Sequence, residues 1–139
     1  MKSARVNERM DWLNTGFYRD FGYGLVYPQL FPHHKRRSDE AQAATIEIGQ
    51  QNAKRWLKIL NDHWIGPNNK YLCGNQLTIA DYFGAAVTTA GELVHCDLSA
   101  YPNIKRWLDT FKAGPNYAKI YETFNSFVAS TKGQPWQAI

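Results

Sequence analysis

Residues 77–94, with the sequence LTIADYFGAAVTTAGELV, begin with a helix start signal and continue as an almost uncharged helical pattern. Thr78 occupies an N-cap position and Asp81 follows three residues later, which is the spacing of a capping box. Apolar residues then recur at intervals of three and four, at Ile79, Phe83, Ala86, Ala90 and Val94. A helix that is apolar on nearly every side is expected at the centre of a domain. We therefore interpret Thr78 and Asp81 as a structural capping box, in preference to Asp81 as a general acid or base.

The rest of the chain also has helical patterns. Besides 78–95, the periodicity predicts helices near 3–31, 38–65, 102–112 and 115–129, followed by a polar tail over 130–139. No run of alternating β-branched residues closes on a tight turn, so strands are not expected. The prediction is a single all-α domain over residues 1–139. It is a five-helix bundle with two long antiparallel helices, a buried third helix and two shorter helices that close the far side.

Charge and cysteine content exclude several kinds of partner. The 16 basic and 12 acidic residues give a net charge of +4 and are mostly interleaved, so no nucleic-acid partner is expected. The basic run 33–37 is interpreted as a solvated loop, with an anion or nucleic-acid contact as the alternative. No apolar run is long enough to cross a membrane. Cys73 and Cys96 show no metal-ligand spacing, which favours a metal-free protein with reduced thiols in the cytoplasm.

Motifs for catalysis are missing, whereas aromatic residues are abundant. The chain has no GxSxG, P-loop or HExxH motif, and no catalytic residue is predicted. Aromatic residues make up 14% of the chain and crowd the first predicted helix, at Trp12, Phe17, Tyr18, Phe21, Tyr23 and Tyr27. A single helix face buries only some of these rings. We expect several of them to be exposed, where they cover a partner domain or line an apolar pocket.

Two motifs resemble the C-terminal helical domain of the cytosolic glutathione transferases. The segment KYLCGNQLTIADYFGAA contains the family's pattern L-x-G-x-x-x-T/S-x-A-D, at Leu72, Gly74, Thr78, Ala80 and Asp81. The segment AYPNIKRWLDTFKAGPNYAKI opens with the pattern Y-P-N-I/V-x-x-W, at Tyr101, Pro102, Asn103, Ile104 and Trp107. The opening RVNERMDWLNTGFY resembles the first helix of that domain, and YPQLF resembles its bent end. The resemblance spans residues 3 to 128.

The resemblance implies roles for particular residues. It implies a hydrophobic-substrate pocket that includes Phe17, Tyr18 and Phe21, and a position for Asn14 near the glutathione of a partner subunit. Trp136 either folds over this pocket or belongs to a disordered tail. Glutathione is implied as a co-substrate and no cofactor is implied. The family's thiol-activating residue lies in a preceding thioredoxin-like domain, and this chain begins where the helical domain begins, so the isolated chain is not expected to be catalytic.

Two functions remain open. The first is the hydrophobic-substrate-binding and dimerisation half of a glutathione transferase that conjugates glutathione to electrophilic small molecules, in detoxification. Its implied partners are a thioredoxin-like glutathione-binding domain, a second copy of the chain and hydrophobic small molecules. The alternative is a non-catalytic protein-interaction module, because similar domains occur in translation factors and aminoacyl-tRNA synthetases.

Overall fold

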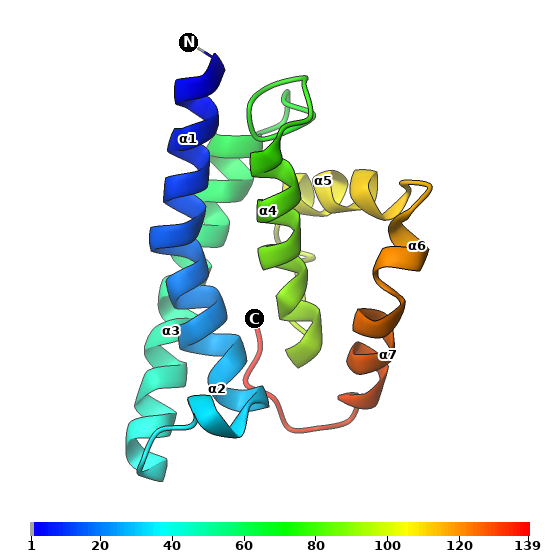
Figure 1. The fold of residues 1–139 in the computed structure, drawn as a ribbon. Helices are drawn as coiled ribbons and strands as arrows, with labels where there is room; N and C mark the ends of the chain where they lie inside the picture. Colours follow the sequence, from blue (N-terminus) through cyan, green and yellow to red (C-terminus); the bar gives the residue numbers. More distant parts are fainter. Residues whose placement is uncertain (1) are drawn as a thin grey trace.

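The computed structural model describes residues 2–139, and all regular structure among them is helical (Figure 1). In this part of the chain the only β-type pairing is an isolated bridge between Tyr71 and Gly74. None of the helices described combines the length and the hydropathy that a membrane span requires. The predicted all-α class is confirmed.

Two long helical rods lie side by side and antiparallel (Figure 1). The first rod joins α1 (Lys2–Trp12) through the π-helical segments η1 (Leu13–Phe17) and η2 (Arg19–Val26) to α2 (Tyr27–Leu30). The 3₁₀ turn η3 (Pro32–His34) leads to the second rod, which consists of α3 (Asp39–Ile59) and the π-helical η4 (Leu60–Ile65). Beside them lie α4 (Ile79–Thr89), its 3₁₀ extension η5 (Ala90–Val94), α5 (Pro102–Lys112), α6 (Tyr117–Ile120) and α7 (Glu122–Ser130). The expected helix 115–129 is thus divided at Tyr121, where the backbone leaves the helical region.

Glycines allow the two rods to approach closely. A Cβ atom on Gly49 of α3 would collide with the backbone of Gly24 in η2, so neither position has room for a side chain. Near this crossing the indole Nε1 of Trp56 donates a 2.7 Å hydrogen bond to Asp20. Backbone contact between the rods therefore fixes the orientation of η2, which carries Phe21 and Tyr23.

Helix α4 is central, but it is not buried on every side. Gly84 faces the core so closely that a Cβ atom there would lie 3.1 Å from Leu13, Leu72 and Trp107. By contrast, Ile79 is 65% exposed and Ala86 is exposed, so the predicted buried stripe is wrong at these two positions. The physical reason is that α1, α3 and α5 do not enclose α4. One side of α4 remains open on the face shown in Figure 1.

The Asp81 carboxylate connects four hydrogen-bond donors at the start of α4. Its side chain has no exposed area. Oδ2 accepts hydrogen bonds from the backbone N–H and the hydroxyl of Thr78, both at 2.9 Å. Oδ1 accepts from the backbone N–H of Leu72 at 2.7 Å and from the indole Nε1 of Trp107 at 3.2 Å. The capping box formed by Thr78 and Asp81 is present, and its carboxylate also joins the preceding loop to α5.

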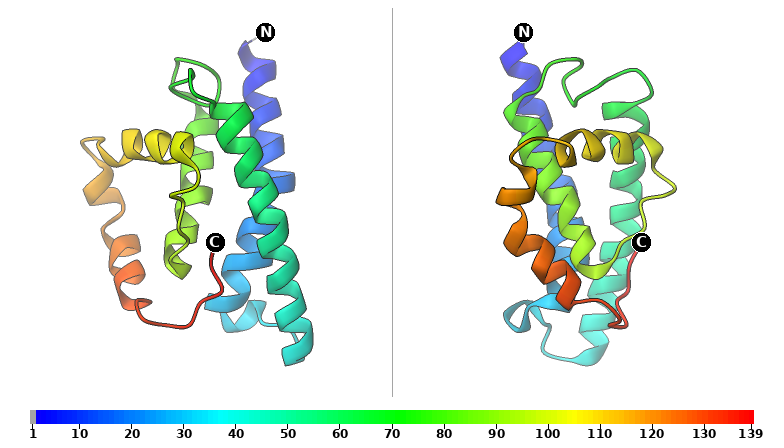
Figure 2. Two further views of the ribbon diagram at one scale, coloured as in Figure 1. Left: turned by 180° about the vertical axis from the view of Figure 1, so that it is seen from behind. Right: turned by 90° about the vertical axis from the view of Figure 1, so that its right-hand side faces the viewer.

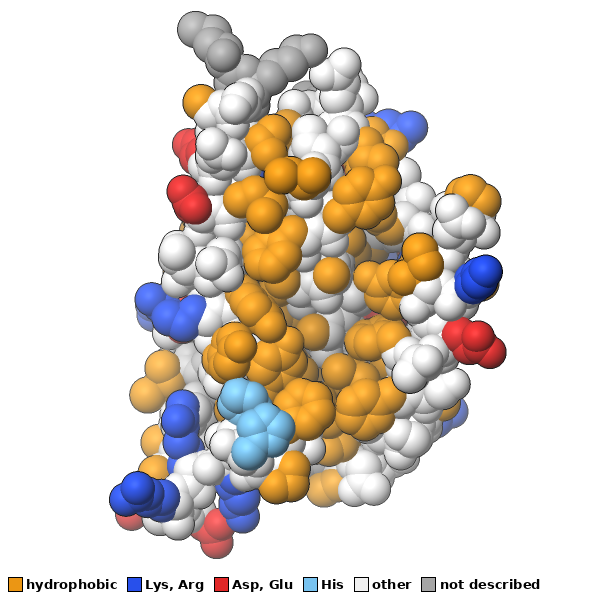
Figure 3. Space-filling view, viewed as in Figure 1, with side chains coloured by type: hydrophobic (Ala, Val, Ile, Leu, Met, Phe, Trp, Pro, Cys, Tyr) orange, Lys and Arg blue, Asp and Glu red, His pale blue; other side chains and the backbone are white. Residues whose placement is uncertain are grey.

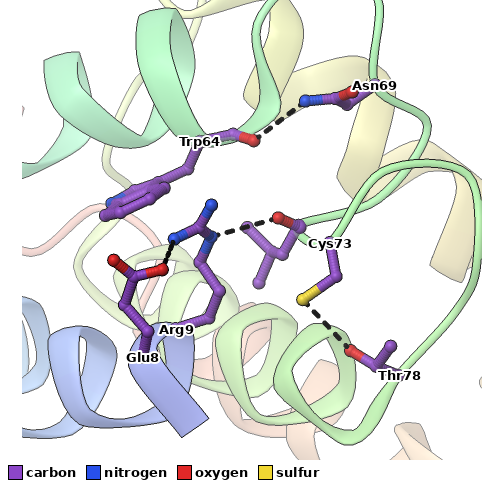
Figure 4. Close-up of polar contacts among 7 residues, drawn as sticks. Glu8, Arg9, Trp64, Asn69, Cys73 and Thr78 are labelled. Carbon is purple, nitrogen blue, oxygen red and sulfur yellow. Dashed lines mark hydrogen bonds and ion pairs between the residues drawn. The ribbon is translucent and has the colours of Figure 1, made fainter. Parts of the chain in front are cut away.

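The loop before α4 is also attached to α1 (Figure 4). The Arg9 guanidinium lies 3.3 Å from the centre of the Trp64 ring and donates from Nε to the carbonyl of Leu72 at 3.2 Å. Glu8 pairs with the same guanidinium at 2.7 Å. Burial lowers the pKa of Arg9, and the neighbouring Glu8 opposes this shift. Arg9 thus joins η4, the loop and the first rod.

Asn61 explains why the Y-P-N-I pattern begins a helix. The buried Oδ1 of Asn61 accepts hydrogen bonds from the backbone N–H groups of Asn103, at 2.9 Å, and Ile104, at 3.2 Å. In return, Nδ2 of Asn103 donates to the carbonyl of Asn61 at 3.0 Å. Pro102 at the helix start has no N–H to satisfy, and Asn61 satisfies the N–H groups of the next two residues. A residue distant in the sequence therefore caps α5.

Substitutions at the capping box test its structural role. Asp81→Ala leaves buried donors on Leu72, Thr78 and Trp107 unpaired, so we expect a loss of about 3 kcal/mol or more in the free energy of unfolding. Thr78→Ala removes one hydroxyl and should cost about 1 to 2 kcal/mol, whereas Thr78→Ser should be nearly neutral. Chemical denaturation measures all three. Equal losses from Ala and Ser at position 78 would show that the methyl group matters and the cap does not.

Candidate functional site

Three tyrosines of the first rod form an aromatic surface outside the core. The ring of Tyr18 lies 5.2 Å from that of Tyr23 and 6.0 Å from that of Tyr27, in both cases edge to face. Tyr23 and Tyr27 are themselves 5.1 Å apart. Gly22 makes room for this arrangement, because a Cβ atom there would lie 2.7 Å from the Tyr18 ring. The hydroxyls of Tyr18 and Tyr27 are hydrogen-bonded at 2.9 Å.

Neighbouring segments extend this surface. Phe83 of α4 packs edge to face on Tyr18 at 6.2 Å, and His34 lies 5.4 Å from Tyr23. Phe31 follows α2, and its ring lies 6.4 Å from that of Phe127 on α7. We call this group the aromatic site: Tyr18, Tyr23, Tyr27, Phe31, Phe83 and Phe127, with His34 at its border. It belongs to the wide hydrophobic band in Figure 3, which covers the face open at α4.

The tyrosine hydroxyls add a polar feature to an apolar surface. Burial raises the pKa of Tyr18, and the hydrogen bond to Tyr27 raises it further. Interaction with the Tyr18 hydroxyl also raises the pKa of Tyr23. These hydroxyls therefore stay protonated at neutral pH and can donate hydrogen bonds. The site can hold an apolar, preferably aromatic molecule and can donate to an acceptor oxygen on it.

The predicted site residues lie in different places. Phe17 and Phe21, which the resemblance implied for the pocket, are stacked 4.9 Å apart with no exposed area. They fill the core between the first rod and α4, and their burial does not support a contact with a ligand. Tyr18 is partly buried and belongs to the aromatic site, whereas Asn14 is exposed one turn earlier. Trp136 packs against the core beside Pro28 and Ile46, away from the aromatic rings of this site, and its tail, 131–139, runs along the back of the bundle (Figure 2).

Sequence periodicity missed the contacts that bring the site together. Tyr18 and Tyr27 are nine residues apart, which is about two and a half turns of an α-helix and places them on opposite faces. The structure contains wider turns, in which Tyr18 N–H bonds to Leu13 O and Tyr27 N–H to Gly22 O. These five-residue π-helical bonds bring both tyrosines to one side. A possible signal was the local excess of glycine, at 16, 22 and 24.

A second apolar feature lies between α4, α5 and α6. It is a hollow of about 520 Å³ lined by Tyr71, Leu77, Tyr82, Phe111, Tyr117 and Tyr121, among others. Large apolar side chains at its rim are exposed, including Tyr82 at 60% and Ile120 at 71%. An exposed apolar hollow of this size is typical of a surface that a ligand or a partner covers.

Within residues 2–139, no group of three metal-ligating side chains comes together. Both cysteines are free, and burial raises the pKa of Cys96, which favours the unreactive thiol. The chemical groups that the aromatic site offers to a ligand are its aromatic rings and its tyrosine hydroxyls.

Comparison with known proteins identifies the family. Residues 19–115 match the family model of the glutathione S-transferase C-terminal domain. The chain belongs to this family. A glutathione S-transferase D6 of Drosophila melanogaster is 28% identical to this domain over 76% of the chain and 44% of the fly protein. A delta-class glutathione transferase of Nilaparvata lugens has a similar structure, with a TM-score of 0.64 and 26% identity, over 94% of this chain and 58% of that one.

The glutathione S-transferase C-terminal domain described here thus spans about half the length of these relatives. The family accounts for the two sequence motifs. Asp81 and Trp107, one from each motif, meet in one hydrogen bond, and Asn103 of the second motif meets Asn61. Both motifs are therefore structural, and the functional residues must be sought on the aromatic site and the hollow.

Titration of Tyr117 provides a test of the hollow. Burial, followed by the charge of Glu92, raises its pKa from 10.0 to about 12. Between these values the folded chain keeps a proton that the unfolded chain releases, so this group's contribution to stability is present below pH 10 and lost as the pH rises through about 12. Tyr117→Phe should reduce the alkaline loss of stability, measured by urea unfolding across this range. Tyr82→Phe, at an exposed position of the same hollow, is the control, and equal effects would contradict the assignment.

Proposed function

We propose that this domain is the hydrophobic-substrate-binding half of a glutathione transferase that conjugates glutathione to electrophilic small molecules. The aromatic site is the observation that supports this function best. It offers rings from three parts of the chain, with Tyr18 and Phe83 partly buried and Phe127 exposed, together with the protonated hydroxyl of Tyr18. An aromatic electrophile would stack on these rings, and an oxygen on it would accept a hydrogen bond from Tyr18 or Tyr27.

We propose that glutathione and its thiol-activating group come from a thioredoxin-like domain that covers the face in Figure 3. Exposed Leu77, Tyr82 and Ile120 line the 520 Å³ hollow there, and Ile79 of α4 is exposed as well. Covering them would remove a large apolar area from water, which is the main driving force for association. The longer relatives support a second domain, because this chain spans 44% of the fly protein.

A second copy of the chain is proposed to bind along the two rods, so that the complete enzyme is a homodimer. Ile48 and Ile59 project outward from α3 and are 58% and 38% exposed. Asn14 is exposed on the neighbouring rod, where we propose that it contacts the glutathione held by the other subunit. In this proposal the protein acts in detoxification, and glutathione is a co-substrate.

Dye binding tests the aromatic site. We expect anilinonaphthalene sulfonate to bind the folded chain, and Tyr18→Ala to weaken binding by about tenfold, since one aromatic contact is worth about 1.4 kcal/mol. Tyr82→Ala in the hollow is the matched control and should change the affinity little. Fluorescence titration measures both, with circular dichroism confirming equal helix content. The reverse order of effects would place the ligand in the hollow.

Complementation tests whether conjugation requires a thioredoxin-like domain in addition to this domain. The isolated chain should not accelerate conjugation of glutathione to an aryl halide. Fused behind a delta-class thioredoxin-like domain it should do so, and Tyr18→Ala in the fusion should lower kcat/KM. Sedimentation of the fusion reports whether it is a dimer. A fusion that folds and binds glutathione, yet does not conjugate, would favour a non-catalytic interaction module.

A further inference from the structure

The last six residues, 134–139, form an extended segment that we call the strap. Gln29 of α2 makes two hydrogen bonds to one residue of it: Nε2 donates to the carbonyl of Gln137 at 2.9 Å, and Oε1 accepts from the Gln137 N–H at 2.8 Å. Gln50 of α3 donates to the carbonyl of Ala138 at 2.6 Å. The backbone N–H of Asp97 donates to the carbonyl of Ile139. Three consecutive backbone carbonyls of the strap are therefore held by α2, α3 and the loop after η5.

Apolar contacts anchor the same segment. Trp136 and Ile139 pack against the core, and Trp136 shares a hollow of about 500 Å³ with Pro28 and Ile46. The indole Nε1 of Trp136 donates to the carbonyl of Thr131 at 2.9 Å, which connects the strap to the end of α7. The strap thus runs along the back of the bundle, from α7 to the first and second rods (Figure 2).

The strap matters because α6 and α7, here called the arm, are weakly anchored. Neither helix contributes a buried residue, and Phe124 and Val128 are only partly buried. Gly114 and Pro115 precede the arm, and Gly133 follows it with a φ of 81°, a conformation that favours glycine. At its C-terminal end Thr131 is buried and bonds to the ring of His95 at 3.2 Å. Immediately after this point the strap begins.

The arm also carries one side of the aromatic site. Phe127 of α7 lies 6.4 Å from Phe31, which follows α2. The position of α7 relative to α2 therefore sets the separation of these two rings. The strap joins the same two elements on the opposite side of the molecule, through Gln29 and Thr131.

We propose that the strap is a conformational latch that holds the arm against the first rod and so controls access to the aromatic site. Because Gln29 and Gln50 bind backbone groups, the latch depends on the extended shape of the segment and on Trp136 as its apolar anchor. Releasing it frees the arm between its flanking glycines and separates Phe127 from Phe31. The regulatory part of this inference rests on the proposed function, whereas the coupling of strap and arm does not.

Hydrogen exchange measured by mass spectrometry tests the coupling in the full chain. Gln29→Ala with Gln50→Ala removes three hydrogen bonds to the strap, and we expect exchange of the arm amides, 117–130, to accelerate by about tenfold or more. Exchange in α3 and α4 should stay unchanged. Gln51→Ala is the matched control, because Gln51 is exposed on the same helix and bonds only to Glu47 among the described contacts. Faster exchange in the strap with an unchanged arm would overturn the proposal, as would a strap that is already unprotected in the wild-type chain.

Rescue in trans distinguishes a latch from general destabilisation. A chain that ends at Gly133 should show the same fast exchange in the arm, and a synthetic peptide of residues 134–139 should restore protection. The same peptide with its Trp replaced by Ala should not restore it. If the truncated chain does not fold, the double glutamine variant decides alone. Dye binding by the aromatic site is measured in parallel. A wild-type chain that does not bind the dye would count against the proposed function, whereas unchanged amide exchange of the arm in the variants would count against the latch.

Discussion

The buried carboxylate of Asp81 is the interaction on which the rest of the domain depends. Its two oxygens accept four hydrogen bonds, from the loop, from the helix start and from α5. A polar group without exposed area is costly unless its hydrogen-bonding capacity is filled, and here it is filled by donors that would otherwise be unpaired. The start of α4, the loop before it and the Trp107 indole are thereby fixed together.

From this fixed centre, close helix packing leads to the aromatic site. Gly84 lets α4 lie against Leu13 and Trp107, and the Gly24–Gly49 contact sets the second rod against η2. With η1 packed against α4 and η2 packed against α3, the wide turns of both segments hold Tyr18 and Tyr27 on one face. The chain therefore separates its aromatic residues into two groups. One group fills the core, and the other forms a surface whose rings and hydroxyls remain available.

The family assignment and the exposed face support one another. A self-contained bundle would enclose its central helix, yet α4 presents Ile79 and Tyr82 to solvent beside a large apolar hollow. The relatives are about twice as long as this chain, and the proposed partner domain would cover that face. The back of the bundle differs, because there the tail itself covers the core through Trp136 and Ile139.

The sequence by itself determined the all-α class, the capping box and the family, because helical periodicity, cap residues and motif spacings can be recognised in the linear order of the residues. It also placed an excess of aromatic rings in the first helix. Only the tertiary structure decided which of them are exposed: a 3.6-residue period cannot anticipate the π-helical turns that bring Tyr18 and Tyr27 to one side. Phe17 and Phe21, which the resemblance implied for the pocket, lie in the core. The course of the tail was likewise undetermined, because Gln137 and Ala138 are held by Gln29 and Gln50 of distant helices, and such long-range hydrogen bonds leave no periodic pattern in the sequence.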